Sequence, residues 1–204
     1  MIRFLVALLV LLAAPAFATQ ERWPALFDVA GVAANDVLNV RAAPDAGAEK
    51  IGELAPDARG VEVIAADARQ NWGQVNVNGQ TGWASLHYLR RQPGQWLGST
   101  IETVRCFGTE PFWSVTRSVD AISWSMPEGR PDGTVQSDLA SLARRDVSGL
   151  IYRLTDGMRG HLLMTLDSCS DGMSNYTYGI GAAVTHDLDG TPELLAGCCS
   201  LDVD

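Results

Sequence analysis

Basic charge is scarce in this chain of 204 residues, which has 15 lysine and arginine residues against 24 aspartate and glutamate residues. The formal net charge of −9 argues against nucleic acid or an anionic membrane as a partner, because phosphate groups attract basic surfaces. The acidic residues are unevenly distributed along the chain. Residues 25–91 carry eight acidic and six basic residues, a net of −2, whereas residues 101–204 carry fifteen and seven, a net of −8.

Long apolar runs are missing except at the N-terminus. There, FLVALLVLLAA follows Arg3 and ends at Pro15 and the small-residue sequence AFA, which is typical of a secretory signal peptide. The run is shorter than the about 20 apolar residues that span a bilayer. We therefore expect a signal peptide at residues 1–18, with an uncleaved anchor as the alternative. The mature chain should be periplasmic or secreted, with no membrane attachment after signal removal.

Cysteine and histidine are few, and their spacing does not suit zinc. The four cysteines lack Cys-x-x-Cys spacing and have no histidine nearby, so we expect no metal and no other cofactor. Four cysteines in an exported chain favour two disulfides. Cys198 and Cys199 are poorly placed to bond to each other, and neighbours on a strand point to opposite faces. Each should therefore bond to one of Cys106 and Cys169.

Helical periodicity is almost absent, and short β-type runs alternate with turn residues, which predicts an all-β protein. About 185 residues after the signal fit two small domains, which we place at residues 26–91 and 101–204. Residues 92–100 contain Pro-Gly and predict a linker. Trp96 within it is expected to pack between the domains.

The second half contains seven β-type runs and one segment with helical character. The runs are TVRCF, FWSVTRS, AISWSM, LIYRLTD, HLLMTLDSC, YTYGIGAAVTHD and ELLAGCCSLDV, which predict a β-barrel or a β-sandwich. The segment SDLASLARR is the one expected helical turn. Asp138 near its start and two arginines at its end suit the helix dipole.

The first half has a clear hairpin signal. WGQVNV alternates as a half-buried strand does, and the following Asn78-Gly79 pair favours a type I′ turn. The sequences LNVRAAPDAGAEKIGEL and VEVIAADARQNWGQVNVNGQTGWASLHYL together resemble a bacterial SH3 domain. The resemblance implies a small SH3-like β-barrel. In exported bacterial proteins this fold commonly binds cell-wall peptides or accompanies an envelope enzyme.

Three aromatic residues of this half, Trp72, Trp83 and Tyr88, are candidates for a ligand groove. Amphipathic rings on one face of a barrel can stack on sugars or peptides. The alternative is that both tryptophans belong to the core. The expected partner is peptidoglycan or an envelope protein.

The second half resembles a family of uncharacterised exported bacterial proteins. The shared motifs are GTEPFW at residues 108–113, CSDGMS at 169–174 and Gly197-Cys198. The resemblance implies a compact β domain in the envelope and a disulfide between Cys169 and Cys198, which leaves Cys106 for Cys199. It supplies no established activity.

Glu110, Trp113 and Asp171 lie in these motifs without an assigned role. Glu110 has the chemistry of a general acid if it is buried against Phe112 and Trp113, because burial raises a carboxyl pKa. Glycoside hydrolysis needs two facing carboxylates, and Asp171 is the candidate second. The alternative is that Glu110 and Asp171 only shape turns, and we expect no catalytic residues. We thus predict an envelope binding protein; the alternatives are an inhibitor of a cationic wall hydrolase such as lysozyme, and a hydrolase using Glu110 and Asp171.

Overall fold

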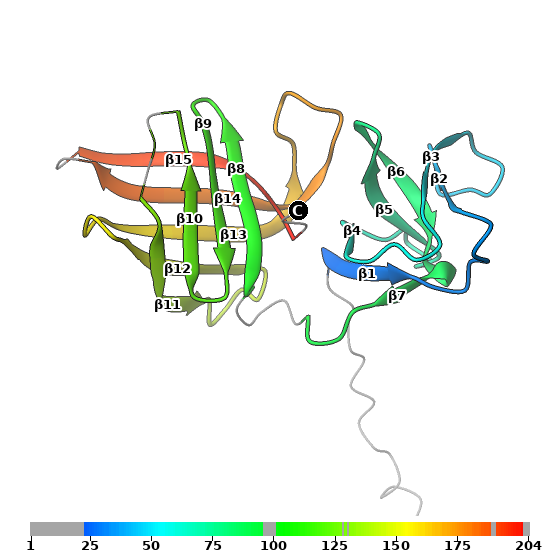
Figure 1. The fold of residues 1–204 in the computed structure, drawn as a ribbon, viewed down its shortest axis with the longest axis horizontal. Helices are drawn as coiled ribbons and strands as arrows, with labels where there is room; N and C mark the ends of the chain where they lie inside the picture. The colour runs from blue at the N-terminus through cyan, green and yellow to red at the C-terminus, as the bar shows by residue number, and fades with distance from the viewer. Residues whose placement is uncertain (1–22, 96–100, 128, 130, 189–190, 202–204) are drawn as a thin grey trace, which may run out of the picture.

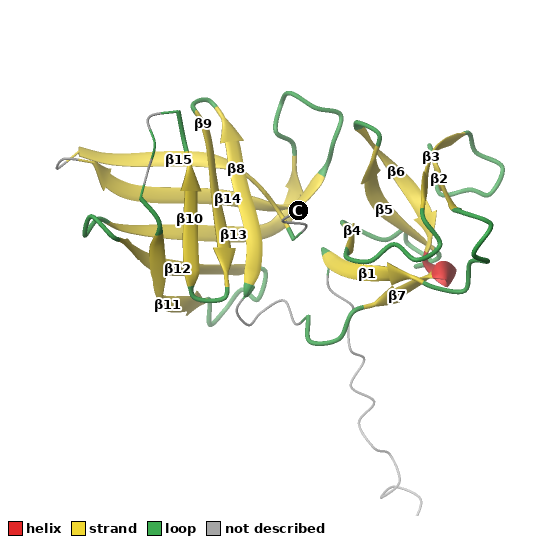
Figure 2. Ribbon diagram, in the orientation of Figure 1, coloured by secondary structure: helices red, strands yellow, loops and turns green. Residues whose placement is uncertain are grey.

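The computed structural model describes residues 23–95, 101–127, 129, 131–188 and 191–201. The expected signal peptide at residues 1–18 and the linker residue Trp96 lie outside this part. The described chain is built from strands with one short 3₁₀ helix, as the colours of Figure 2 show, so the all-β prediction is confirmed. No helix in the described ranges is long and apolar enough to cross a membrane.

The N-terminal unit comprises strands β1 to β7, which form two sheets that share one buried cluster. A three-stranded sheet has the order β4-β1-β7, and a four-stranded sheet has the order β3-β2-β6-β5. The elements are β1 (Ala25–Val29), β2 (Leu38–Arg41), β3 (Lys50–Leu54), β4 (Val61–Val63), β5 (Trp72–Val77), β6 (Gln80–Ser85), the 3₁₀ helix η2 (Leu86–Tyr88) and β7 (Leu89–Arg91).

The β5–β6 hairpin has the predicted turn. Asn78 and Gly79 both have positive φ angles, of 50° and 83°, and Val77 pairs with Gln80 across them. A two-residue turn of this kind matches the twist of the flanking strands. The alternation in β5 is also confirmed, because Gly73 and Val75 are buried while Trp72, Gln74 and Asn76 are only partly covered.

The C-terminal barrel is closed by eight antiparallel strands in the order β10-β11-β12-β13-β14-β15-β8-β9 (Figure 1). The sequence left open whether this half is a barrel or a sandwich, and the closed sheet shows that it is a barrel. The strands are β8 (Thr103–Thr109), β9 (Phe112–Ser118), β10 (Ala121–Ser125), β11 (Gly133–Ala140), β12 (Val147–Leu154), β13 (Arg159–Cys169), β14 (Tyr178–Leu188) and β15 (Thr191–Ser200).

The prediction of a helical turn at SDLASLARR is wrong. This segment begins inside β11, which pairs with β12 from Gly133 to Ala140 and supplies the strand that the seven runs lacked. Asp138 does not cap a helix, since its Oδ1 lies 2.5 Å from Nη1 of the buried Arg117 on β9. The hydrogen bonds and this ion pair of the closed barrel outweigh the weak local preference for helix.

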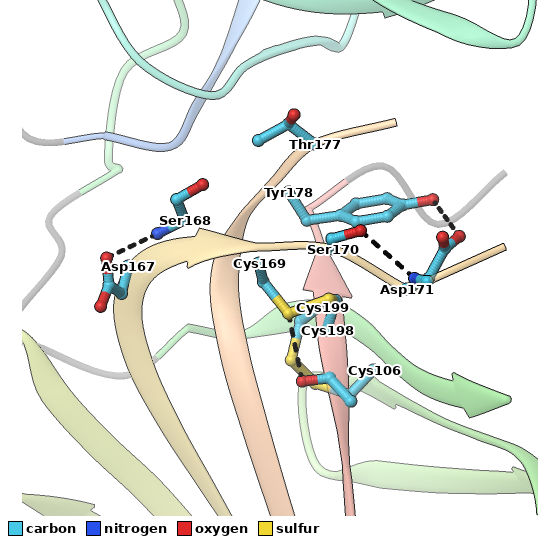
Figure 3. The surroundings of a disulfide bond; sticks show 12 residues. Cys106, Asp167, Ser168, Cys169, Ser170, Asp171, Thr177, Tyr178, Cys198 and Cys199 are labelled. Atoms are coloured by element: carbon cyan, nitrogen blue, oxygen red, sulfur yellow. Dashed lines mark hydrogen bonds between the residues drawn. A yellow bond between two sulfur atoms is a disulfide. The ribbon is translucent and has the colours of Figure 1, made fainter. Parts of the chain in front are cut away.

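Both implied disulfides are present. Cys106 on β8 lies opposite Cys199 on β15 and bonds to it, while Cys198 bonds to Cys169 at the end of β13. Figure 3 shows the two bridges next to each other at one end of the barrel. The two adjacent cysteines have different partners because successive residues of a strand point to opposite faces.

The N-terminal unit and the barrel are joined by hydrogen bonds at two places. The loop between β13 and β14, orange in Figure 1, lies beside the β5–β6 hairpin, and Thr81 N donates to Asn175 O at 3.2 Å. Thr177 N donates to Thr81 Oγ1 at 2.7 Å. At the second place Glu62 on β4 accepts from Ser200 Oγ at 2.5 Å and from Leu201 N at 3.0 Å. These bonds set the space between the two units.

Candidate functional site

A cleft of about 1220 Å³ separates the N-terminal unit from the barrel. One wall consists of residues 59–62, at the start of β4, together with parts of β1, β3 and β5. The other wall consists of the outer parts of β8 and β9, residues 125–127, the loop after β13 and the end of β15. Residues of the motifs GTEPFW and CSDGMS lie along this second wall.

The motif GTEPFW forms the β8–β9 hairpin at the cleft. A Cβ atom on Gly108 would lie 2.3 Å from Nε1 of Trp113 and 2.7 Å from Ala196 O, so glycine is required for the indole to pack there. Trp113 points into the barrel and is only 3% exposed. Its neighbour Phe112 points outward, is 59% exposed and lines the cleft.

Glu110 does not have the environment expected of a general acid. It is exposed at the two-residue tip of the β8–β9 hairpin, where Thr109 pairs with Phe112. A role as general acid would require burial of Glu110 against Phe112 and Trp113, but strand alternation turns these two rings in opposite directions. Glu110 is also not among the residues that line the cleft.

Asp171 shapes the loop between β13 and β14. Its Oδ1 accepts hydrogen bonds from Met173 N at 3.0 Å and Ser174 N at 2.8 Å, and its Oδ2 accepts from Ser174 Oγ at 2.9 Å. Burial opposes the charged form, but these bonds outweigh it and hold the pKa of Asp171 below its usual value. Asp171 is therefore an ionised turn residue, as the alternative interpretation has it.

Tyr178 connects this loop to the disulfides. Its ring lies above the two bridges, and its hydroxyl points toward Asp171 (Figure 3) with an O–O distance of 3.5 Å. Burial raises the pKa of Tyr178, and the nearby charge of Asp171 raises it further. The phenol consequently remains neutral and available as a hydrogen-bond donor at neutral pH.

The charged residues along the cleft are of two kinds. Both carboxylates that line it, Glu62 and Asp171, accept hydrogen bonds from within the protein. The side chains of the two arginines are exposed. Arg59 is 83% exposed in its side chain, with Asp28 3.8 Å away, and Arg105 is exposed with its Cζ 5.8 Å from the centre of the Phe107 ring.

The sequence candidates Trp72, Trp83 and Tyr88 lie outside the cleft lining. Trp72 pairs with Ser85 and Gln74 with Trp83, so the two tryptophans are diagonal neighbours on one face of the four-stranded sheet. Both are half-buried, whereas Val75 and Ala84 on the opposite face form the core. Tyr88 is 38% exposed on η2, and no ring contact among the described residues joins it to either tryptophan.

The tryptophan face continues to the contact with the barrel. Asn76 and Thr81 face each other on the same side of the β5–β6 hairpin, and Asn76 Nδ2 donates to Thr177 O at 2.9 Å. The aromatic face and the cleft are thus two separate surfaces near one interface.

The comparison with family models bears on the N-terminal unit. Residues 36–90 match the family model of the bacterial SH3 domain. The match runs from just before β2 into β7, so the matched range leaves out β1 and the whole barrel. No curated protein and no solved structure matches the chain.

Reasoning from the sequence missed the cleft and its residues Arg59, Glu62 and Arg105. They come from distant parts of the chain, and their individual sequence surroundings carry no signal. Phe112 and Met173 lie within the motifs GTEPFW and CSDGMS. A large apolar residue in a turn-forming motif indicates that its side chain faces a surface. Among the described residues, no cluster of histidine, cysteine, aspartate and glutamate has the arrangement of a metal site.

Proposed function

We propose that this chain is an exported protein of the bacterial cell envelope that binds peptidoglycan through its SH3 domain. The observation that carries the proposal is the pair Trp72 and Trp83, which lie half-buried on one outer face of a domain matched as bacterial SH3. Half-buried indoles provide flat apolar area with a polar N–H, which suits stacking on sugar rings and peptide planes. The two disulfides and the N-terminal apolar run support export.

The proposed role is binding without catalysis. A two-carboxylate hydrolase needs one proton donor and one carboxylate across the same site. Asp171 is held ionised by backbone hydrogen bonds and lines the cleft, while Glu110 is exposed at a hairpin tip outside that lining. This arrangement supports a structural role for both residues.

The test is co-sedimentation of the full mature chain with purified peptidoglycan. We expect the wild-type chain to pellet with the wall and Trp72→Ala and Trp83→Ala each to weaken binding by about tenfold, equal to about 1.4 kcal/mol. Leu142→Ala is the matched control, because Leu142 is a fully exposed apolar residue of the barrel. Thermal unfolding of each variant checks that the SH3 domain remains folded.

Two outcomes would contradict the proposal. If the wild-type protein stays in the supernatant, the chain resembles bacterial SH3 domains in fold but does not bind peptidoglycan. Release of soluble wall fragments by the purified chain, abolished by Glu110→Gln, would show an enzyme instead. A chain that leaves the wall untouched but slows added lysozyme, more at low salt than at high salt, would favour the inhibitor alternative, which the charge of −8 in residues 101–204 supports.

A further inference from the structure

We propose that the cleft between the N-terminal unit and the barrel is a second binding site, for a short extended peptide that carries a carboxylate. The site is distinct from the tryptophan face of the SH3 domain, and residues of both units are needed to form it. Four features of the cleft support this assignment: its size, its exposed arginines, its exposed apolar side chains and its strand edge.

The size of the cleft indicates a ligand of several residues. Sites for drug-sized molecules usually measure about 300–1,000 Å³, and the cleft measures about 1220 Å³. Glu62 and its partners Ser200 and Leu201 line the cleft, and their hydrogen bonds join its two walls. The space is therefore part of the folded arrangement of the two units.

Two arginines and two carboxylates line the cleft, and of these only the arginines are hydrogen-bond donors. Glu62 and Asp171 already accept internal hydrogen bonds, whereas the exposed guanidinium groups of Arg59 and Arg105 have donors to spare. Arginine binds a carboxylate through two parallel hydrogen bonds. A polyanion is disfavoured by the overall negative charge, so a ligand with a single carboxylate fits best.

Phe112 and Met173 supply apolar contact on the barrel side. They are 59% and 68% exposed, come from two different motifs and both line the cleft. A flexible thioether beside an aromatic ring adapts to varied apolar side chains. Exposed apolar side chains that gather at a hollow are typical of binding sites.

The polar groups of the cleft suit the backbone of an extended peptide. Strand β4 is the outer strand of its sheet, and residues 60–62 at its start line the cleft, which is the setting for addition of a peptide strand.

The experiment is an NMR titration of the ¹⁵N-labelled mature chain with the tripeptide N-acetyl-Leu-Ala-Ala, compared with its C-terminal amide. We expect shifts at residues 105–113 and 171–178 with the acid, and binding about tenfold weaker with the amide, since a hydrogen-bonded charge is lost. Arg105→Gln should weaken binding of the acid by a similar factor. Arg159→Gln is the matched control, because Arg159 is exposed on β13 away from the cleft.

Phe112→Ser separates apolar contact from charge, and should weaken the acid and the amide alike. The proposal is overturned if acid and amide bind equally, if Arg105→Gln binds the acid as wild type does, or if the shifts occur only around Trp72 and Trp83. Co-sedimentation of Arg105→Gln with peptidoglycan should stay at the wild-type level. Failure of the cleft site and failure of the proposed wall binding are therefore seen in different measurements.

Discussion

At the scale of single residues, the motifs GTEPFW, CSDGMS and Gly197-Cys198 serve the geometry of the barrel. A Cβ atom on Gly197 would lie 1.9 Å from the carbonyl oxygen of Phe107, so only glycine lets β15 approach β8. Gly108 does the same for the ring of Trp113. Asp171 holds the β13–β14 loop through backbone hydrogen bonds. The motifs thus place Phe112 and Met173 on the surface by shaping what lies beneath them.

The pKa of Asp171 leads to a prediction of pH dependence. Its folded pKa is depressed, so it contributes stability that is fully present above the unfolded pKa of about 3.9 and is lost as the pH falls through the folded value. We expect Asp171→Asn to destabilise the barrel at pH 7 and to reduce the fall in stability below about pH 4. Thermal unfolding between pH 2 and pH 7 measures both effects.

Asp120→Asn provides the control, since Asp120 lies exposed in the turn between β9 and β10. Its acid dependence should match that of the wild type. Parallel curves for Asp171→Asn and wild type across the whole range would mean that the hydrogen bonds at Asp171 contribute nothing to acid stability.

At the scale of elements, β8 and β15 are the point where the barrel closes. Among the described residues they form three residue pairs, and one of these is the disulfide-bonded pair Cys106 and Cys199. Cys169 and Cys198 then tie the end of β13 to β15 across β14. The loop of residues 170–177, which contacts the SH3 domain, starts directly from this second bridge.

Removing the Cys169–Cys198 bridge should destabilise the barrel. The two residues are 29 apart in the sequence, and the chain-entropy treatment gives about 3–4 kcal/mol for a loop of this length. We expect the double variant Cys169→Ser and Cys198→Ser to lose about this free energy of unfolding in denaturant titrations. Fluorescence and NMR signals of the SH3 domain report whether that domain is spared. An unchanged unfolding midpoint for the barrel would rule out a stabilising role for the bridge.

At the scale of the whole molecule, the two units are held at a defined distance by few but specific contacts. Thr81 and Asn76 bond to the backbone of residues 175–177, and Glu62 bonds to the end of β15. The backbone of residue 175 also forms a single parallel bridge with Gln80. Because these contacts flank the cleft, the arrangement of the units and the proposed peptide site depend on each other.

Breaking both contacts should separate the units without unfolding them. We expect the triple variant Asn76→Ala, Thr81→Val and Glu62→Ala to show a larger radius of gyration in small-angle X-ray scattering than the wild type, because these side chains lose interface hydrogen bonds worth about 1 kcal/mol apiece. Glu53→Ala is the control, since Glu53 is exposed on β3 and pairs only with Lys50 among the described residues. Identical scattering from variant and wild type would show that other contacts hold the units.

Much of the fold could be predicted from the sequence, because the signals are local. Alternation in WGQVNV identified β5, and Asn78-Gly79 identified the turn after it, since both depend on residues a few positions apart. The different partners of Cys198 and Cys199 follow from the geometry of any strand. The family resemblance then implied which of the two remaining pairings is present, and the structure confirms it.

Tertiary structure decided the features that depend on distant residues. Residues 137–140 of SDLASLARR lie in β11 because this strand pairs with β12 in the closed barrel and Asp138 forms an ion pair with the buried Arg117. Glu110 lies exposed at a hairpin tip, while Asp171 is held in its turn by the loop backbone. The cleft exists only where the two units meet, so no local sequence pattern predicts its arginines or its strand edge. Periodicity and turn chemistry depend on short stretches of sequence. A site between two units depends on how the units pack against each other.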